Sequence, residues 1–228
     1  MIKIAIDGPS GAGKSTLAKR LSKKLGFIYV DTGALYRAVG LYIFENSIPV
    51  TSPESIVAAL DNIDIGLEFC DGVQKVYLNG RDVGDEIRRP EISMYASTVS
   101  AIPAVRKFLL DKQRDIAEKN NVIMDGRDIG TVIMPDAQVK IYLVSSAEKR
   151  AERRYRELVE KGIDISYAEV LSDMTKRDEQ DSTRAASPAL PAEDAVFLDN
   201  SGLTLDETLN EALRIVCEKA NISNQLFV

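Results

Sequence analysis

Residues 2–15 read IKIAIDGPSGAGKS, an apolar run typical of a strand followed by a complete match to the phosphate-binding pattern G-x-x-x-x-G-K-[ST]. Glycines let the backbone curl around a pyrophosphate, and the helix expected from Lys14 directs the positive end of its dipole at the anion. Lys14 would bridge the β- and γ-phosphates, and Ser15 would give Mg²⁺ a hydroxyl ligand. The predicted nucleoside triphosphate site comprises Gly8, Pro9, Ser10, Gly11, Ala12, Gly13, Lys14, Ser15 and Thr16.

A glycine-rich turn can match this pattern by chance, so the flanking sequence matters. Downstream of the motif, Leu17, Ala18, Leu21 and Leu25 recur on one helical face, and Gly26 suits a helix C-terminus. Strand, loop and helix in this order are the context that the motif requires. The context favours nucleotide binding over a chance match.

The composition limits the chemistry available to the chain. It has 228 residues, 45% of them hydrophobic, which suits one principal domain rather than two large ones. Histidine is absent, which excludes imidazole bases and His-ligated metals, and the two cysteines form no C-x-x-C motif. Lysine, arginine, carboxylates, hydroxyls and Mg²⁺ are the groups that perform phosphoryl transfer.

The charge and hydropathy patterns limit the partners. A net charge of −6 argues against a duplex nucleic acid as partner. No apolar stretch is long enough to cross a bilayer, and the chain opens on a strand rather than on a charged leader with an apolar segment. We expect a cytoplasmic protein that binds neither nucleic acid nor membrane.

Five short apolar runs alternate with helical stretches along the chain. The runs are Ile2–Ile6, Phe27–Val30, Val122–Met124, Val139–Val144 and Ala195–Leu198. This alternation predicts an α/β fold with a five-stranded parallel sheet and helices on both faces. Asp7, Asp31 and Asp125 each follow directly after one of these runs. Because ligands of such sheets bind at the carboxyl ends of the strands, the site is expected there.

Residues 63–84 interrupt this alternation. Apolar and polar side chains alternate strictly from Ile63 to Cys70, which is the period of a half-exposed strand, and Asp71-Gly72 and Asn79-Gly80 supply two turns. We predict a small antiparallel meander inserted into the α/β core. The pattern does not separate a surface decoration from a substrate-binding subdomain.

A helix is expected over residues 147–160, with arginines on one face. Arg150, Arg153 and Arg154 are spaced i, i+3 and i+4, so they can meet a polyphosphate together. Interleaved Glu148, Glu152 and Glu157 make an ordinary salt-bridged helix an equal alternative.

Two further motifs place arginines after strands. DTGALYR spans residues 31–37 and DGRDIGT spans residues 125–131, and each brings an arginine to a position where a second phosphate can bind. The N-K-x-D element by which GTPases read guanine does not occur in the sequence. These motifs favour a kinase over a GTPase.

With these motifs the chain resembles the bacterial-type cytidylate kinases, a family of nucleoside monophosphate kinases. GPSGAGKS, DTGALYR, DGRDIGTV and the stretch KRDEQDSTR at residues 176–184 fall in the family's order, and together they cover most of residues 1–200. The antiparallel segment resembles the insert that lengthens the bacterial form. The resemblance implies a single P-loop kinase domain over residues 1–228, with an acceptor-binding insert at about 60–100 and an arginine-rich lid segment at about 148–190.

The resemblance also implies roles for single residues around the acceptor nucleotide. The acceptor phosphate is expected near Thr32, Arg37, Arg127 and Arg184. The base is expected near Tyr36, Ser97, Arg106 and Asp128, and the ribose near Asp181. Cytosine suits Asp128, because its exocyclic amine donates a hydrogen bond that a carboxylate accepts, whereas uracil presents a carbonyl there.

The arginines of residues 147–160 resemble the lid residues that close over the donor phosphates. The resemblance therefore assigns Arg153 to donor binding and the transfer step to Lys14, Arg127, Arg184, Arg150 and Arg154. On the sequence alone, Arg106 reads as a solvated residue at a helix start, and Asp181 with Arg184 as an i, i+3 surface pair.

The expected function is ATP-dependent, Mg²⁺-assisted phosphorylation of CMP, and of dCMP, by a monomeric enzyme. A monophosphate dianion is already nucleophilic near neutral pH, so the reaction needs no histidine base. The alternatives are the same fold acting on UMP, AMP or a small alcohol, and a nucleotide-operated switch that transfers nothing.

Overall fold

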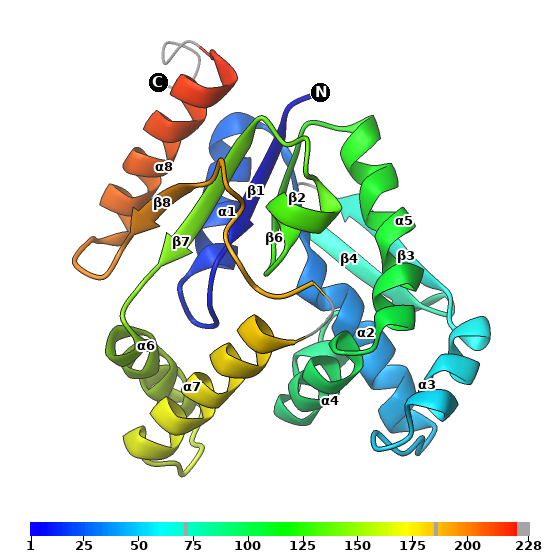
Figure 1. Ribbon diagram of the computed structural model, residues 1–228. Coiled ribbons are helices and arrows are strands. Elements are labelled where there is room, and N and C mark those ends of the chain that lie inside the picture. Colours follow the sequence, from blue (N-terminus) through cyan, green and yellow to red (C-terminus); the bar gives the residue numbers. More distant parts are fainter. Residues whose placement is uncertain (71–72, 185–186, 223–228) are drawn as a thin grey trace. The chain divides into compact units, whose positions relative to one another are not determined.

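The computed structural model describes residues 1–70, 73–184 and 187–222, and Figure 1 labels the helices and strands. The chain divides into two compact units. Unit 1 comprises Met1 and residues 28–122, and unit 2 comprises residues 2–27 and the chain from residue 123 onward. Each unit has helices and strands of its own.

A five-stranded parallel sheet runs in the order β2-β6-β1-β7-β8 (Figure 1). Its strands are β1 (Lys3–Asp7), β2 (Ile28–Asp31), β6 (Val122–Asp125), β7 (Val139–Val144) and β8 (Val196–Asp199). Ile4 of β1 lies opposite Val139 of β7, and Ile141 of β7 lies opposite Val196 of β8. The five predicted strands are confirmed, each within one residue of its predicted bounds.

The inner strand β1 is buried because its apolar run is continuous. Ile4, Ala5 and Ile6 have no exposed surface, as expected for a parallel strand with both faces covered. The helices of unit 2 are α1 (Lys14–Leu25), α6 (Ala147–Glu160), α7 (Tyr167–Thr183) and α8 (Leu205–Ala220). α1 packs against β1 and α8, and α8 contacts β7 and β8. These contacts fix the start of α1 at the carboxyl end of β1.

α6 and α7 form a helix pair within unit 2. Ala151 and Leu158 of α6 pack with Val170 and Met174 of α7 in a separate apolar cluster. α7 begins at a capping box, in which Ser166 and Glu169 satisfy each other's backbone N–H groups. The pair carries polar residues of the site described below.

Unit 1 is built around α2 (Thr32–Glu45), which packs extensively against α4 (Pro90–Ser100). α3 (Pro53–Ala59), α5 (Pro103–Lys119) and the 3₁₀ turns Leu60–Asn62 and Glu86–Arg88 complete its helical part. Leu35, Leu41, Ile92 and Leu109 belong to one core that α2, α4 and α5 share. This core holds the carboxyl end of β2 and the start of α2 in place.

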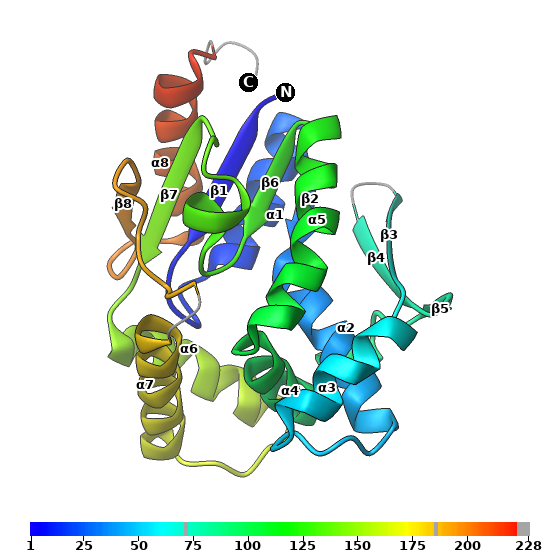
Figure 2. The same ribbon diagram turned by 45° about the vertical axis from the view of Figure 1, so that its right-hand side comes forward.

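The predicted antiparallel meander is present in unit 1 (Figure 2). It consists of β3 (Ile65–Cys70), β4 (Val73–Leu78) and β5 (Arg81–Asp82), and Ile65 pairs with Leu78. Asn79 and Gly80 turn the chain with positive φ angles of 49° and 79°, which suits this hairpin pair. The predicted turn at Asp71-Gly72 lies outside the described residues.

Candidate active site

The glycine-rich loop joins β1 to α1, as the motif predicts. Gly8 has a φ of 145°, and a Cβ atom there would lie 2.1 Å from the carbonyl oxygen of Leu143. Gly13 caps α1 in a left-handed conformation with a φ of 94°. A side chain at Gly8 would therefore collide with the backbone of β7, and only glycine fits. Thr16 lies exposed in the first turn of α1.

Lys14 is buried, and its Nζ donates a hydrogen bond of 2.7 Å to the carbonyl oxygen of Pro9. Burial holds the pKa of Lys14 well below its usual range, and the positive charge of Arg127 lowers this pKa further. A bound polyanion would favour the charged form of Lys14. The loop thus presents a cation whose charge needs an anionic ligand.

Asp7 connects the end of β1 to the DGRDIGT motif. Its two carboxylate oxygens accept hydrogen bonds from the backbone N–H groups of Ile129 and Gly130, at 2.8 and 2.7 Å. These residues begin a π-helical turn, Ile129–Ile133. Burial raises the pKa of Asp7 to about 6, although both amides and Lys14 oppose the rise. The charged form of Asp7 is therefore costly in the folded protein.

A hydroxyl and a carboxylate lie together at the start of α1. Ser15 Oγ donates a hydrogen bond of 2.8 Å to Asp125 Oδ2, and Asp125 ends β6. Hard oxygen ligands of this kind suit Mg²⁺, which completes its shell with waters and substrate phosphates. The sequence indicated Asp125 as a strand-end carboxylate but did not assign it to the metal.

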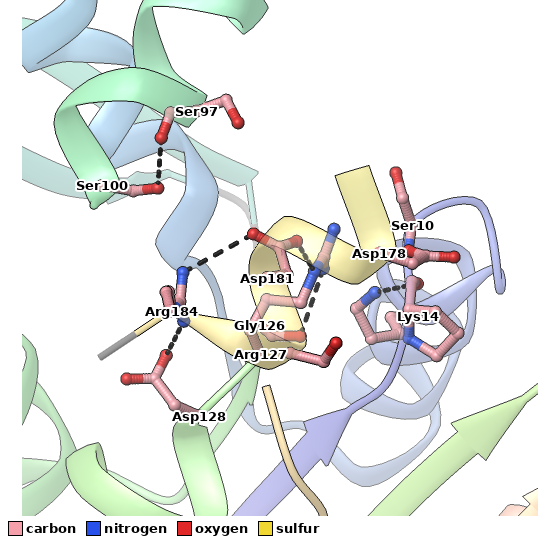
Figure 3. A network of polar contacts seen from close by, with 12 residues as sticks. Ser10, Lys14, Ser97, Ser100, Gly126, Arg127, Asp128, Asp178, Asp181 and Arg184 are labelled. Carbon is pink, nitrogen blue, oxygen red and sulfur yellow. Dashed lines mark hydrogen bonds and ion pairs between the residues drawn. The ribbon is translucent and has the colours of Figure 1, made fainter. Parts of the chain in front are cut away.

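An aspartate of α7, Asp178, is hydrogen-bonded to the backbone of the glycine-rich loop (Figure 3). Asp178 Oδ1 accepts a hydrogen bond of 3.1 Å from the N–H of Ser10. Arg150 Nη1 donates to Asp178 Oδ2 at 2.5 Å and to the carbonyl oxygen of Ser10 at 2.9 Å. An anionic group thus lies on a backbone N–H of the loop and is paired with a buried arginine. Asp178 belongs to the KRDEQDSTR stretch, but no local pattern in the sequence predicts its contact with the loop.

A second group of arginines and aspartates lies in the same unit (Figure 3). Arg127 Nε donates to Asp181 Oδ2 at 2.9 Å. Arg184 lies 3.6 Å from Asp181 Oδ1 and 3.8 Å from Asp128 Oδ1. None of the four side chains is more than 19% exposed, so Asp181 and Arg184 are not a solvated surface pair. We refer to Arg127, Asp128, Asp181 and Arg184 as the arginine–aspartate network.

Arg153 and Arg154 of α6 have different surroundings. Arg153 donates to the carbonyl oxygen of Asn200 at 3.2 Å, and Asn200 Nδ2 donates to the carbonyl oxygen of Ala12 at 2.9 Å. Asn200 thus ties Arg153 to the glycine-rich loop. Arg154 pairs with Glu157 one turn along α6 and is 42% exposed, so the structure places it in an ordinary helical salt bridge.

A cavity of about 440 Å³ lies between α6 and the loop that follows β8. Its lining residues are Lys149, Glu152, Arg153, Arg156, Ser201, Gly202, Leu203 and Thr204. Three cations line this cavity, and Arg153 connects it through Asn200 to the glycine-rich loop. Nothing in the sequence indicates Asn200 except its position directly after a strand.

Unit 1 holds the other predicted site residues. Thr32 is buried as the first residue of α2, directly after the strand-end Asp31. Arg37 Nη2 donates to Asp31 Oδ2 at 2.6 Å. Both residues of the DTGALYR motif that were expected to contact phosphate therefore lie at the carboxyl end of β2.

Two of the predicted base-binding residues of unit 1, Tyr36 and Arg106, lie together at the start of α5, and Ser97 is connected to them through Ser100. The Arg106 guanidinium lies 5.5 Å from the centroid of the Tyr36 ring, and Arg106 Nη1 donates to the carbonyl oxygen of Ser100 at 3.1 Å. Ser100 Oγ in turn donates to the carbonyl oxygen of Ser97 at 2.8 Å (Figure 3). Arg106 is only partly exposed, so its interpretation as a solvated residue from sequence alone is wrong.

The inner strand β1 of the parallel sheet leads into the glycine-rich loop, and α6 and the motif after β6 supply guanidinium groups. This arrangement is that of a P-loop phosphotransferase. Comparison with known proteins identifies its family. The chain belongs to the cytidylate kinase family, whose sequence model matches residues 4–218.

Individual relatives match the chain almost end to end. A cytidylate kinase of Carboxydothermus hydrogenoformans is 50% identical over 221 residues, which cover 97% of this chain and 100% of the relative. A cytidylate kinase of Caldanaerobacter subterraneus is 52% identical over 216 residues, with 93% and 95% coverage. A solved structure of an uncharacterized protein from Eubacterium ventriosum aligns with a TM-score of 0.51 over 95% of this chain and 98% of its own, at 13% identity. This last likeness supports the fold alone.

Among the residues that the structure describes, none of the helices combines the length and the apolar character that crossing a bilayer would take.

Proposed function

We propose that this chain transfers the γ-phosphoryl group of ATP to CMP and releases ADP and CDP. The observation that carries the proposal is the arginine–aspartate network, found in unit 2 of a chain that belongs to the cytidylate kinase family. A nucleotide-operated switch needs phosphate ligands for one nucleotide only. A second set of partly buried guanidinium groups supports an acceptor that carries its own phosphate.

The donor triphosphate binds to the glycine-rich loop in this proposal. Its phosphate oxygens replace the Asp178 carboxylate at the Ser10 N–H, and Arg150 passes from Asp178 to the phosphates. The cavity of about 440 Å³ beside Arg153 receives the donor nucleoside, since its volume is in the range of small-molecule sites. Arg154 would join the phosphates only after leaving Glu157.

The acceptor phosphate is bound by buried or partly buried guanidinium groups whose planar shape matches phosphate oxygens. Arg37 has this role in unit 1, and Arg127 and Arg184 have it in unit 2. Thr32 would add a hydroxyl to the phosphate ligands. Asp128 reads the cytosine amine and Asp181 the ribose hydroxyls. Tyr36, Ser97 and Arg106 are the proposed contacts of the base in unit 1.

The transfer step needs alignment and charge neutralisation rather than a general base. The acceptor dianion attacks in line with the leaving ADP, while Lys14 and the arginines offset the repulsion between two polyanions. Ser15 and Asp125 present the oxygen atoms that would hold Mg²⁺, whose charge would neutralise the β- and γ-phosphates. The use of dCMP as a second acceptor, the monomeric state and the cytoplasmic location stay predictions.

The proposal is tested by ADP formation from Mg·ATP with CMP, dCMP, UMP, AMP or GMP as the only acceptor, beside a reaction without acceptor. Turnover confined to CMP and dCMP is the expected result. Turnover with another monophosphate alone would refute the cytosine assignment, and ADP release without an acceptor would refute the kinase assignment.

A matched pair of variants tests whether the arginine–aspartate network is needed for turnover of CMP. Arg184→Ala should lower kcat/KM for CMP by at least about 100-fold, since a charge-assisted contact to phosphate is lost. Arg214→Ala serves as control, because Arg214 is exposed and pairs with Glu211 and Glu218 on its own helix, α8. Equal losses in both variants would show that general charge, and not the network, sets the rate.

A further inference from the structure

One side chain of the antiparallel meander reaches the main chain of β2 inside unit 1. Gln74 of β4 accepts a hydrogen bond of 2.7 Å from the Asp31 N–H through Oε1. Its Nε2 donates to the Asp31 carbonyl oxygen at 3.4 Å. A single carboxamide therefore satisfies both backbone groups of one residue, as a neighbouring strand would. β2 lies at one edge of the parallel sheet, so these groups need such a partner.

Asp31 is also the residue that holds Arg37. Its Oδ1 caps α2 by accepting the Ala34 N–H at 3.1 Å, and its Oδ2 accepts from Arg37 Nη2 at 2.6 Å. The backbone of Asp31 is thus fixed by Gln74, and its carboxylate fixes the guanidinium. The three residues form a chain of contacts from β4 to Arg37.

The Arg37 guanidinium lies close to Gly33, beside the Asp31 carboxylate. A Cβ atom at Gly33 would lie 3.1 Å from Arg37 Nη1 and 3.2 Å from Asp31 Oδ1. Arg37 Nε is buried and has no hydrogen-bond partner among the described residues. A buried donor in this situation is satisfied by a ligand such as a phosphate oxygen.

We propose that Gln74 is a positioning residue for the acceptor phosphate, acting through Asp31 on Arg37. This inference rests on the proposed function, because it takes Arg37 as a ligand of the acceptor phosphate. A guanidinium fork binds phosphate well only in a narrow range of orientations, so a small shift of Asp31 is costly. The meander then takes part in acceptor binding and is not a surface decoration.

The test compares Gln74→Ala with Lys75→Ala in steady-state kinetics. Lys75 is the next residue of β4, and its side chain is exposed, so its loss should leave all parameters unchanged. Gln74→Ala should raise KM for CMP about tenfold, the effect of about one net hydrogen bond, and leave kcat and KM for ATP within about twofold. An unchanged KM for CMP would overturn the proposal, and so would equal rises in KM for both substrates.

A double-mutant cycle separates positioning from general stability. If Gln74 acts through Arg37, Gln74→Ala adds nothing to the KM for CMP in an Arg37→Ala background. Additive effects of the two substitutions would overturn the proposal. Gln74→Glu keeps the acceptor for the Asp31 N–H but loses the donor and places a carboxylate at the Asp31 carbonyl, so we expect no rescue.

Turnover by the wild-type protein separates a failure of the proposed function from a failure of the proposed role of Gln74. Wild-type turnover with another monophosphate would refute only the CMP assignment. The KM for that acceptor would then be compared between Gln74→Ala and Lys75→Ala. A wild type that uses no acceptor would refute the proposed function and the role of Gln74 together. Normal wild-type turnover of CMP with no effect of Gln74→Ala would refute the role of Gln74 alone.

Discussion

Asp7→Asn should remove the pH dependence that the Asp7 carboxyl gives to the free energy of unfolding between about pH 4 and pH 7. Burial raises the pKa of Asp7 from 3.8 to about 6 in the folded state. The folded protein therefore holds the Asp7 proton more tightly than the unfolded chain does. The resulting stabilisation is complete below about pH 4 and is lost as the pH rises through about 6.

The magnitude follows from the size of the pKa rise. A shift of about two units corresponds to about 3 kcal/mol between the two protonation states. Asparagine is uncharged, like the protonated acid, and does not ionise over this pH range. Its NH2 group cannot accept the second backbone N–H, but the cost of that lost hydrogen bond is independent of pH. Relative to Asp7→Asn, the wild type should lose about 3 kcal/mol of unfolding free energy between about pH 4 and pH 7.

Urea denaturation at several pH values measures this difference. The chain has no tryptophan, so far-UV circular dichroism is the suitable signal. Asp136→Asn is the control, because the hydrogen bond from Lys3 lowers the pKa of the mostly exposed Asp136. Its small contribution is present above the unfolded pKa and lost as the pH falls, so its slope has the opposite sign. A constant difference between wild type and Asp7→Asn would refute the reasoning.

Three further predictions concern the loop and the base. Lys14→Met should abolish ADP formation while circular dichroism shows an intact fold, and near-normal turnover would contradict the phosphate role of Lys14. Asp128→Ala should lower the preference for CMP over UMP by roughly 10- to 100-fold with KM for ATP changed less than about twofold, as competition kinetics would show. Gly8→Ala should cost more than about 3 kcal/mol in urea denaturation, because its Cβ would lie 2.1 Å from the Leu143 carbonyl oxygen. Gly26→Ala, with a φ of 67° and open space around it, should cost only about 1 kcal/mol, and equal losses would contradict the steric argument.

Local patterns explain why the sheet and the glycine-rich loop were predictable. Continuous apolar runs, a strict alternation of period two and the strand–loop–helix order are properties of neighbouring residues, and each determines one element. The start of α1 at Lys14 and the meander after Ile63 needed no knowledge of distant chain segments.

Contacts between distant residues were not predictable in this way. Asp178 meets Ser10 across 168 residues of chain, and Asn200 meets Ala12 across 188. Such pairings depend on which strands become neighbours, and no local period encodes them. Arg106 illustrates the same limit, because the Tyr36 ring that covers it lies on another helix.

The central position of β1 has a consequence for how the chain is made. Both strands that flank β1 lie far downstream, at residues 122–125 and 139–144. During synthesis β1 emerges before both of these strands and stays without its sheet partners until they have been made. Closing so long a loop is entropically costly, which favours slow folding and a period of exposure to aggregation. We therefore expect nascent chains that stop before residue 139 to bind no nucleotide and to depend on chaperones.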